Sequence, residues 1–136
     1  MSYLLDTNVC IALINSSSAN VRARFTQATR RKALIATSTI VAHELWYGVA
    51  KSQLVEQNAR ALKAFLSRDI AVLDYTERDA HAAGEIRADL EAKGTRIGEY
   101  DTLIAGQAFS RNLVLVTANT REFGRVKGLI VEDWTV

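Results

Sequence analysis

Three carboxylates lie in apolar stretches of the sequence, where an unpaired acid would cost folding free energy. Asp6 directly follows the short apolar run of residues 3–5, whereas Glu44 and Asp101 lie within segments that have a helical pattern. At helical spacing both acids share a face with mainly apolar residues, which are Ile40, Val41, Tyr47 and Gly48 for Glu44 and Ile104, Ala105 and Ala108 for Asp101. Burying an ionised carboxylate costs several kcal/mol unless another group compensates its charge. These three acids are therefore the first candidates for chemistry.

Three kinds of arrangement could compensate such acids. Each acid could pair with Arg or Lys, could cap a helix or stay protonated, or could join the others around a metal ion. No basic residue lies at helical spacing from Glu44, so the three acids together favour a metal ion, while an ion pair or a cap remains the alternative for each one alone. Carboxylate oxygens suit hard cations such as Mg²⁺ or Mn²⁺. Zinc is disfavoured because Cys10, His43 and His81 share no ligand spacing.

A second set of polar residues follows the apolar run of residues 113–116. This set contains Thr117, Asn119 and Glu122. If the strand formed by this run lies beside the first strand, these side chains face the same crevice as Asp6. We therefore expect an oxygen cluster of Asp6, Glu44 and Asp101 that Asn119 or Glu122 completes.

The sequence lacks the residues of several other catalytic sites. Its seven glycines are scattered, so there is no phosphate-binding loop, and there is no Gly-x-Ser-x-Gly turn for a nucleophilic serine. We expect His43 and His81 to be surface or core residues rather than general bases. An aspartyl-phosphate site at Asp6 is disfavoured because its neighbours are Leu5 and Thr7 rather than a second acid. Metal-assisted hydrolysis of a phosphodiester remains, since it needs only acidic ligands.

The elements that must position these residues follow from the hydrophobic pattern. Short apolar runs at 3–5, 34–36, 70–73, 113–116 and 129–131 predict buried strands, and helical patterns cover 9–14, 19–31, 39–51, 54–68, 77–93 and 100–111. Ser38 and the Thr76–Asp79 segment are predicted helix starts. Strands that alternate with helices predict a single α/β domain, residues 1–136, with a parallel sheet between helices. We expect seven other acids to be solvated, namely Asp69, Asp74, Glu77, Asp79, Glu85, Asp89 and Glu91.

Composition narrows the cellular setting and the partners. The 136 residues are 49% hydrophobic and 24% charged, which is typical of a globular domain. Cys10 has no second cysteine to pair with, and no segment resembles a targeting signal or a membrane span, so we expect a cytoplasmic protein. The net charge of +2 hides an asymmetry. Residues 1–43 carry five basic residues and one acid, a net charge of +4, so the remainder carries −2.

Four short motifs resemble those of PIN-domain ribonucleases in order and spacing. They are Leu5-Asp6-Thr7-Asn8, Glu44-Leu45-Trp46-Tyr47-Gly48, the segment from Gly98 to Ala105, and the segment from Val116 to Phe123. Within that group the chain resembles the VapC toxins of bacterial VapBC toxin–antitoxin pairs, over essentially its whole length. The resemblance implies a PIN-like three-layer sandwich with a short parallel sheet of about five strands. It also implies a Mg²⁺-dependent endoribonuclease, with Mn²⁺ as the other candidate ion.

The resemblance assigns roles to individual residues. It places Asp6, Glu44 and Asp101 on the first three acids of the family, which hold the metal. Many members carry Asp where this chain has Asn119, and others carry Asn there together with a Glu that matches Glu122, so a second metal would be held more weakly here. Thr7 and Thr117 match supporting hydroxyl positions. Asn8 is expected to cap the first helix.

The resemblance also implies partners. A VapB-type antitoxin would lay its tail over the active-site groove, operator DNA would be reached only through that antitoxin, and the toxin would form a homodimer. The implied substrate is a tRNA, with the initiator tRNA cut in its anticodon stem-loop as the leading candidate. The alternative is a catalytically weak PIN module that binds RNA or a partner protein without cleavage, because Asn119 brings no charge.

Basic and aromatic residues outside the acidic cluster are candidates for other contacts. The basic residues of the first third of the chain are candidates for holding RNA phosphates: Arg22, Arg24, Arg30, Arg31 and Lys32. Trp46 and Tyr47 could stack on bases, or could belong to the core or a dimer interface. We expect Trp134 to fasten the C-terminal segment to the fold and Cys10 to be a small core residue.

Overall fold

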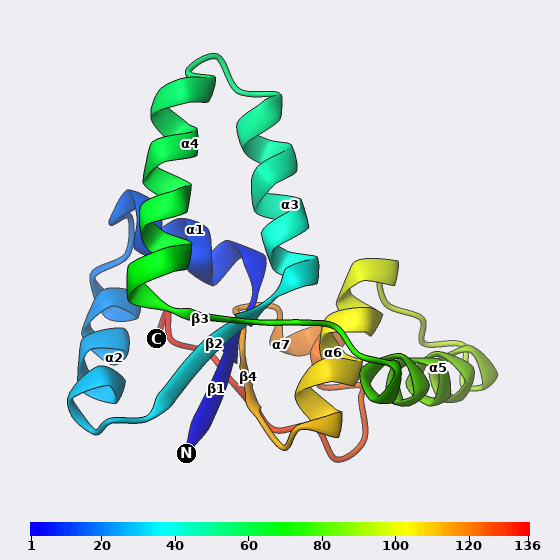
Figure 1. Cartoon of the computed structure of the whole chain (residues 1–136). Helices are drawn as coiled ribbons and strands as arrows, with labels where there is room; N and C mark the ends of the chain where they lie inside the picture. The colour runs from blue at the N-terminus through cyan, green and yellow to red at the C-terminus, as the bar shows by residue number, and fades with distance from the viewer.

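A computed structural model describes all 136 residues and contains one five-stranded sheet (Figure 1). The strands are β1 (Ser2–Leu5), β2 (Leu34–Ser38), β3 (Ala71–Leu73), β4 (Val114–Val116) and β5 (Val131–Glu132), in the spatial order β3-β2-β1-β4-β5. All four pairings are parallel. The five predicted strands and the parallel sheet are confirmed. The last strand lies two residues later than predicted at its start, because only Val131 and Glu132 pair with β4.

Seven helices surround this sheet. They are α1 (Thr7–Asn15), α2 (Ala19–Arg30), α3 (Thr39–Ala50), α4 (Val55–Ala64), α5 (Glu77–Ala92), α6 (Glu99–Ser110) and α7 (Thr120–Phe123). The segment predicted as one helix over 54–68 divides, because α4 passes into a π-helical turn at Phe65–Asp69. The four-residue helix α7 was not predicted, since so short a segment carries no helical period.

Side-chain caps explain where several helices begin. The Ser38 hydroxyl accepts a hydrogen bond from the Ile40 amide at 2.9 Å, and Thr76 with Asp79 forms a capping box at the start of α5, as predicted. The prediction that Asn8 caps the first helix is wrong. Helix α1 begins at Thr7, so Asn8 lies inside its first turn and Asp6 is the cap, its Oδ1 accepting from the Val9 amide at 2.9 Å.

The strand order determines which face of the sheet each helix covers. The chain steps from β1 to β2 to β3 in one direction and then crosses back to β4, so right-handed connections put α5 and α6 on the face opposite α1 to α4. Figure 1 shows this arrangement, with α2 on one side of the sheet, α5 and α6 on the other, and α3 and α4 standing as a hairpin above the strands. The predicted three-layer sandwich is confirmed.

The core extends on both faces of the sheet. Leu4, Leu5, Leu115 and Val116 from the central strands are fully buried. Trp134 is 2% exposed, packs edge-on against Tyr3 with ring centroids 5.2 Å apart, and fastens the C-terminal segment as predicted. Cys10 is a buried core residue, also as predicted, and burial raises the pKa of its thiol to about 12. None of the helices combines the length and the apolar character needed to span a bilayer.

The sheet order also places a crevice. Strands β1 and β4 are neighbours from which the connections depart in opposite directions, and in such sheets ligands bind outside the carboxyl ends of strands at this point. Leu5 of β1 is in register with Val116 of β4. The residues that follow, Asp6 and Thr117, are therefore brought together at the crevice.

Candidate active site

Asp6 lies directly after the carboxyl end of β1, where the strand order places the crevice. Its amide donates to the Val116 carbonyl at 3.1 Å, which extends the β1–β4 pairing by one step, and the residue is only 7% exposed. Burial raises the pKa of Asp6, the hydrogen bonds from Thr117 and the Val9 amide oppose that rise, and the nearby Glu44 carboxylate adds to it. Asp6 is thus a buried carboxylate whose charge is stabilised by hydrogen bonds and by no cation.

Glu44 reaches the crevice from α3 and is half-buried. Its Oε1 accepts a hydrogen bond from the Thr7 hydroxyl at 2.9 Å, so the first residue of α1 orients this carboxylate. Thr7 therefore lies where a supporting hydroxyl was predicted. The predicted apolar surroundings hold only in part, because Val41 is buried but Tyr47 is 61% exposed.

Asp101 comes from the first turn of α6 and is also half-buried. Burial raises the pKa of this carboxyl to about 6, and repulsion from Glu122, Glu44 and Asp6, in that order, contributes further. Four carboxylates from four segments therefore lie near enough to one another to repel, as expected for a cluster without bound cations.

Asn119 and Glu122 lie at the opening of the crevice, at the start of α7. The Asn119 side-chain amide donates to Glu122 Oε2 at 3.0 Å, and the Asn119 main-chain amide donates to the Thr117 hydroxyl at 3.0 Å. Among the neighbouring acids, Glu122 contributes most to the raised pKa of Asp101. The structure thus brings both candidates for the fourth position near the cluster, with Glu122 repelling the Asp101 carboxylate and Asn119 hydrogen-bonded to Glu122.

The ion-pair alternative raised for the three acids does not occur. The six ion pairs of the chain involve Asp79, Glu85, Asp89, Glu91 and Glu132, and none includes Asp6, Glu44, Asp101 or Glu122. No three acidic, cysteine or histidine side chains converge closely enough, as they lie, to hold one metal ion. The donor set nonetheless suits a hard divalent cation, since it consists of carboxylate oxygens and the Asn119 carbonyl. An ion bound here would compensate charges that the protein leaves unpaired, and its binding would require the carboxylates to turn toward one another.

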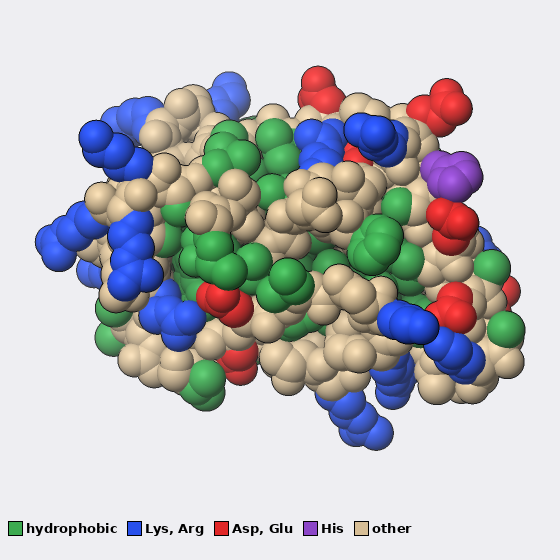
Figure 2. All heavy atoms as spheres, turned by 90° about the horizontal axis from the view of Figure 1, so that it is seen from below, with side chains coloured by type: hydrophobic (Ala, Val, Ile, Leu, Met, Phe, Trp, Pro, Cys, Tyr) green, Lys and Arg blue, Asp and Glu red, His purple; other side chains and the backbone are tan.

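The basic residues on and just after α2 divide into two that are bound to other side chains and three that lie at the far end of the sheet. Arg24 is engaged by Glu132 at 3.3 Å and lies 5.9 Å from the Trp134 ring centroid, and the Arg22 guanidinium donates to the Ser16 hydroxyl. Arg30, Arg31 and Lys32 are exposed, but they precede β2 and so lie at the amino ends of the strands, about 16 Å of strand away from the crevice. Figure 2 views this lower side, where Lys and Arg side chains gather around α2.

Four polar and aromatic residues lie on, or directly after, the helices that carry Glu44 and Asp101. Tyr47 is exposed one turn beyond Glu44, and the Lys51 ammonium lies 4.7 Å from its ring centroid. His43 and Tyr100 form a tilted ring pair with centroids 5.5 Å apart. The sequence analysis did not select Lys51 or Tyr100 as site residues. Their positions could have indicated them, because Lys51 is four residues after Tyr47 and Tyr100 directly precedes Asp101. His81 is an exposed helix residue paired with Glu85.

Comparison with known proteins adds independent information. The family model of the PIN domain matches residues 3–129. The chain is 46% identical over 135 residues to the tRNA(fMet)-specific endonuclease VapC of Shigella flexneri, covering 99% of both chains, and 42% identical over 134 residues to Ribonuclease VapC2 of Rickettsia felis, covering 98% of both. It is also similar to the crystal structure of VapBC2 from Rickettsia felis bound to a promoter DNA fragment, with a TM-score of 0.92, 40% identity and coverage of 98% of this chain and 99% of that one. A DNA-bound VapBC structure from Salmonella typhimurium gives a TM-score of 0.90 at 45% identity, covering 98% of both chains.

Proposed function

Since the chain belongs to the PIN-domain family and, within it, to the VapC ribonucleases, we propose that it is the toxin of a toxin–antitoxin pair whose active site is the cluster of Asp6, Glu44 and Asp101. The observation that carries this assignment is that these acids lie near enough to repel one another and that none is paired with a cation of the protein. The activity is endoribonucleolytic, by hydrolysis of a phosphodiester bond.

Each side chain has a defined part in this mechanism. PIN nucleases are divalent-metal enzymes, and we propose Mg²⁺ here, with Mn²⁺ able to replace it, held by Asp6, Glu44 and Asp101. Bound there, the ion supplies Lewis-acid activation of water and stabilises the charge on the leaving oxygen. Thr7 orients Glu44, while Thr117 and the Val9 amide hold Asp6. Glu122 and the Asn119 carbonyl complete the oxygen shell, and because Asn119 is neutral a second ion would be held more weakly.

We propose the initiator tRNA as substrate, cut in its anticodon stem-loop, because relatives with 45–46% identity over nearly the whole chain carry the name tRNA(fMet)-specific endonuclease. We propose that the exposed Tyr47 and Lys51, on the helix of Glu44 and directly after it, contact the RNA, because Arg30, Arg31 and Lys32 lie at the opposite end of the strands. The enzyme would act in the cytoplasm as a homodimer.

The proposed partner is a VapB-type antitoxin, through which operator DNA would be reached. A groove between α1, α3 and α4 fits its inhibitory tail. Apolar residues line this groove, and Glu44 of the active site lies in its wall; the apolar set is Ile11, Ile14, Leu45, Val49, Ala61 and Leu62. A peptide seated there would contact Glu44, one acid of the cluster.

Cleavage of a defined RNA tests the proposal. Purified Asp6→Ala and Asp101→Asn variants should cleave initiator tRNA at least on the order of a hundredfold more slowly than the wild type in Mg²⁺, with new 5′ ends mapped to the anticodon stem-loop. Asp69→Asn is the matched control, because Asp69 is exposed at the end of the π-helical turn. Full activity of either active-site variant would refute the assignment.

One observation favours the second candidate, a PIN module that binds without cleaving. Asn119 brings no charge to the fourth position, and the side chains as they lie do not yet form a tight ligand set. Calorimetric titration with Mn²⁺ separates the two candidates. Binding at millimolar or lower concentration supports the nuclease, and absence of binding supports the module.

A further inference from the structure

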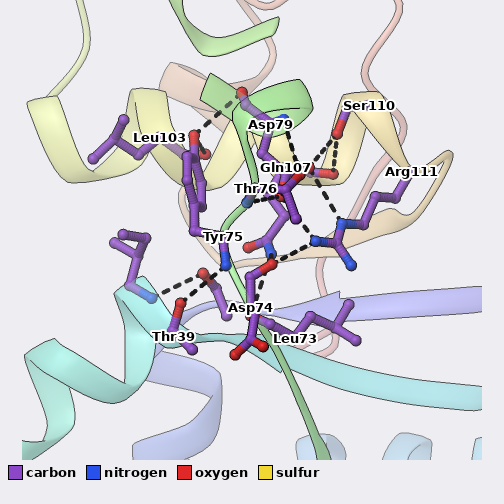
Figure 3. Close-up of polar contacts among 12 residues, drawn as sticks. Thr39, Leu73, Asp74, Tyr75, Thr76, Asp79, Leu103, Gln107, Ser110 and Arg111 are labelled. Carbon is purple, nitrogen blue, oxygen red and sulfur yellow. Dashed lines mark hydrogen bonds and ion pairs between the residues drawn. The ribbon is translucent and has the colours of Figure 1, made fainter. Parts of the chain in front are cut away.

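Tyr75 joins the two helices that carry Glu44 and Asp101. It lies in the segment between β3 and α5 and is half-buried. Its amide donates to the Thr39 hydroxyl of α3 at 3.3 Å, and its own hydroxyl donates to the Leu103 carbonyl of α6 at 2.8 Å. The Asp79 carbonyl of α5 is a second, longer acceptor of the same hydroxyl at 3.4 Å. Figure 3 shows these contacts, with the Tyr75 ring extending from the loop toward α6. One residue therefore ties the start of α3 to the first half of α6.

The second half of α6 is fixed by other contacts. Gln107 donates from its side-chain amide to the carbonyls of Leu73 and Asp74, both at 3.3 Å, and Arg111 just beyond the helix pairs with Asp79. Gly106 lies so close to α5 that an added Cβ would be 2.6 Å from the Cβ of Ala83. This end of α6 therefore has little freedom to move.

The first half of α6, which carries Asp101, has fewer side-chain hydrogen bonds to other elements. Gly98 at its start provides no side-chain cap, and the Thr102 hydroxyl bonds only back to the Gly98 carbonyl. The hydrogen bond from Tyr75 is the one side-chain hydrogen bond that reaches residues 99–103 from another element. Leu103 is two residues from Asp101, about 3 Å along the helix axis. The Tyr75 hydroxyl is thus hydrogen-bonded to the turn of α6 that carries Asp101.

We propose that Tyr75 is a positioning residue that sets the separation of Glu44 and Asp101 and thereby the affinity of the site for its divalent ion. The inference rests on the proposed function, since it concerns the same acids. It follows from the hydrogen bonds of Tyr75 and from the lack of any other side-chain hydrogen bond from another element at the start of α6. The one other side-chain link noted between α3 and this turn is the tilted His43–Tyr100 ring pair, which fixes no hydrogen-bond geometry. Burial, with a smaller effect of Asp79, raises the pKa of the Tyr75 phenol to about 12, so the hydroxyl keeps its proton and donates throughout the neutral range.

The test replaces only the hydroxyl. Tyr75→Phe keeps the ring and its packing, and residues that orient metal ligands from behind typically change metal affinity by tenfold or more when lost. We expect the Kd for Mn²⁺, measured by calorimetry without RNA, to rise about tenfold. Tyr3→Phe is the matched control, because the Tyr3 hydroxyl contacts only the exposed Met1 sulfur. Its Kd should equal that of the wild type.

Variants at the other end of the tie keep the inference falsifiable. Thr39→Val removes the acceptor on α3 and should raise the Kd in the same direction, whereas Thr39→Ser keeps the hydroxyl and should restore wild-type affinity. A Tyr75→Phe protein that unfolds at lower urea but binds Mn²⁺ as the wild type does would show a merely structural role and overturn the inference. If the wild type cleaves RNA and binds Mn²⁺, and Tyr75→Phe binds Mn²⁺ with the same Kd, only the inference about Tyr75 fails. If the wild type does neither, the proposed function fails as well.

Discussion

Replacing Asp79 by asparagine should lower the free energy of unfolding by about 2 kcal/mol at pH 7. Asp79 has no exposed surface. Its carboxylate accepts two hydrogen bonds from Arg111, at 3.2 and 2.9 Å, one from the Ser110 hydroxyl, and two from Thr76, through its amide at 2.9 Å and its hydroxyl at 3.1 Å. The asparagine keeps the size of the side chain and removes the charge that attracts these donors.

The magnitude follows from the pKa of Asp79. Burial raises this pKa, but the hydrogen bonds of Arg111, Ser110 and Thr76 outweigh burial and lower it from 3.8 to about 2. Each pKa unit corresponds to about 1.4 kcal/mol, so the ionised carboxylate contributes about 2 kcal/mol. The loss should stay near this value rather than reach the ~3–5 kcal/mol of a fully buried broken pair. The reason is that the Arg111 side chain is 28% exposed and water can solvate it.

The pH dependence distinguishes the charge from simple packing. A carboxyl whose pKa is lowered on folding contributes its full stability above its unfolded pKa of 3.8 and loses it as the pH falls toward 2. The difference in unfolding free energy between wild type and Asp79→Asn should therefore be complete at pH 7 and roughly half as large at pH 3.

Urea unfolding followed by circular dichroism at both pH values measures this difference. Asp89→Asn is the matched control, because Asp89 lies in the same helix and pairs with Lys93 at the surface at 3.0 Å. Such exposed pairs are worth less than about 0.5 kcal/mol. A gap that does not narrow from pH 7 to pH 3, or a control that costs as much as Asp79→Asn, would refute the reasoning.

Three further substitutions probe the packing and the site. Gly106→Ala should cost about 1–3 kcal/mol of stability in thermal unfolding, because its Cβ would lie 2.6 Å from Ala83; an unchanged melting temperature would contradict the close approach of α5 and α6. Asn119→Asp adds a carboxylate beside Glu122 and should lower the Mg²⁺ concentration for half-maximal cleavage severalfold, so a raised requirement would argue against Asn119 as part of the shell. Trp134→Phe removes the Nε1 donor to Glu132, 3.0 Å away, and should cost about 1–3 kcal/mol by urea unfolding, whereas a stability equal to wild type would show that the C-terminal segment is fastened elsewhere.

The features predicted correctly from sequence are those that depend on local pattern. Each strand is a short apolar run and the start of α5 is a capping box, so neighbouring residues contain the information. The position of Asp6 at a strand end near Thr117 followed from the rule for parallel sheets once the strands were known.

The features that escaped prediction depend on residues far apart in the chain. Asp79 was expected to be solvated, yet it is buried, because Arg111, 32 residues later, folds against it. The Tyr75 contacts with Thr39 and Leu103 span 36 and 28 residues and follow from no local period. Likewise, the α2 cations could be counted in the sequence, but only the strand direction shows that Arg30 and its neighbours lie at the far end of the sheet.

The buried thiol of Cys10 provides a way to measure local unfolding around α1. It is the one cysteine of the chain, it is fully shielded beneath the acidic crevice, and it bonds to the Thr37 hydroxyl at 3.7 Å. With its pKa raised to about 12 by burial, it stays a thiol in the native state and does not react with alkylating reagents. The rate at which an alkylating reagent labels the protein therefore measures how often α1 separates from the sheet, and a bound antitoxin or metal ion that closes the crevice should slow that labelling without any engineered probe.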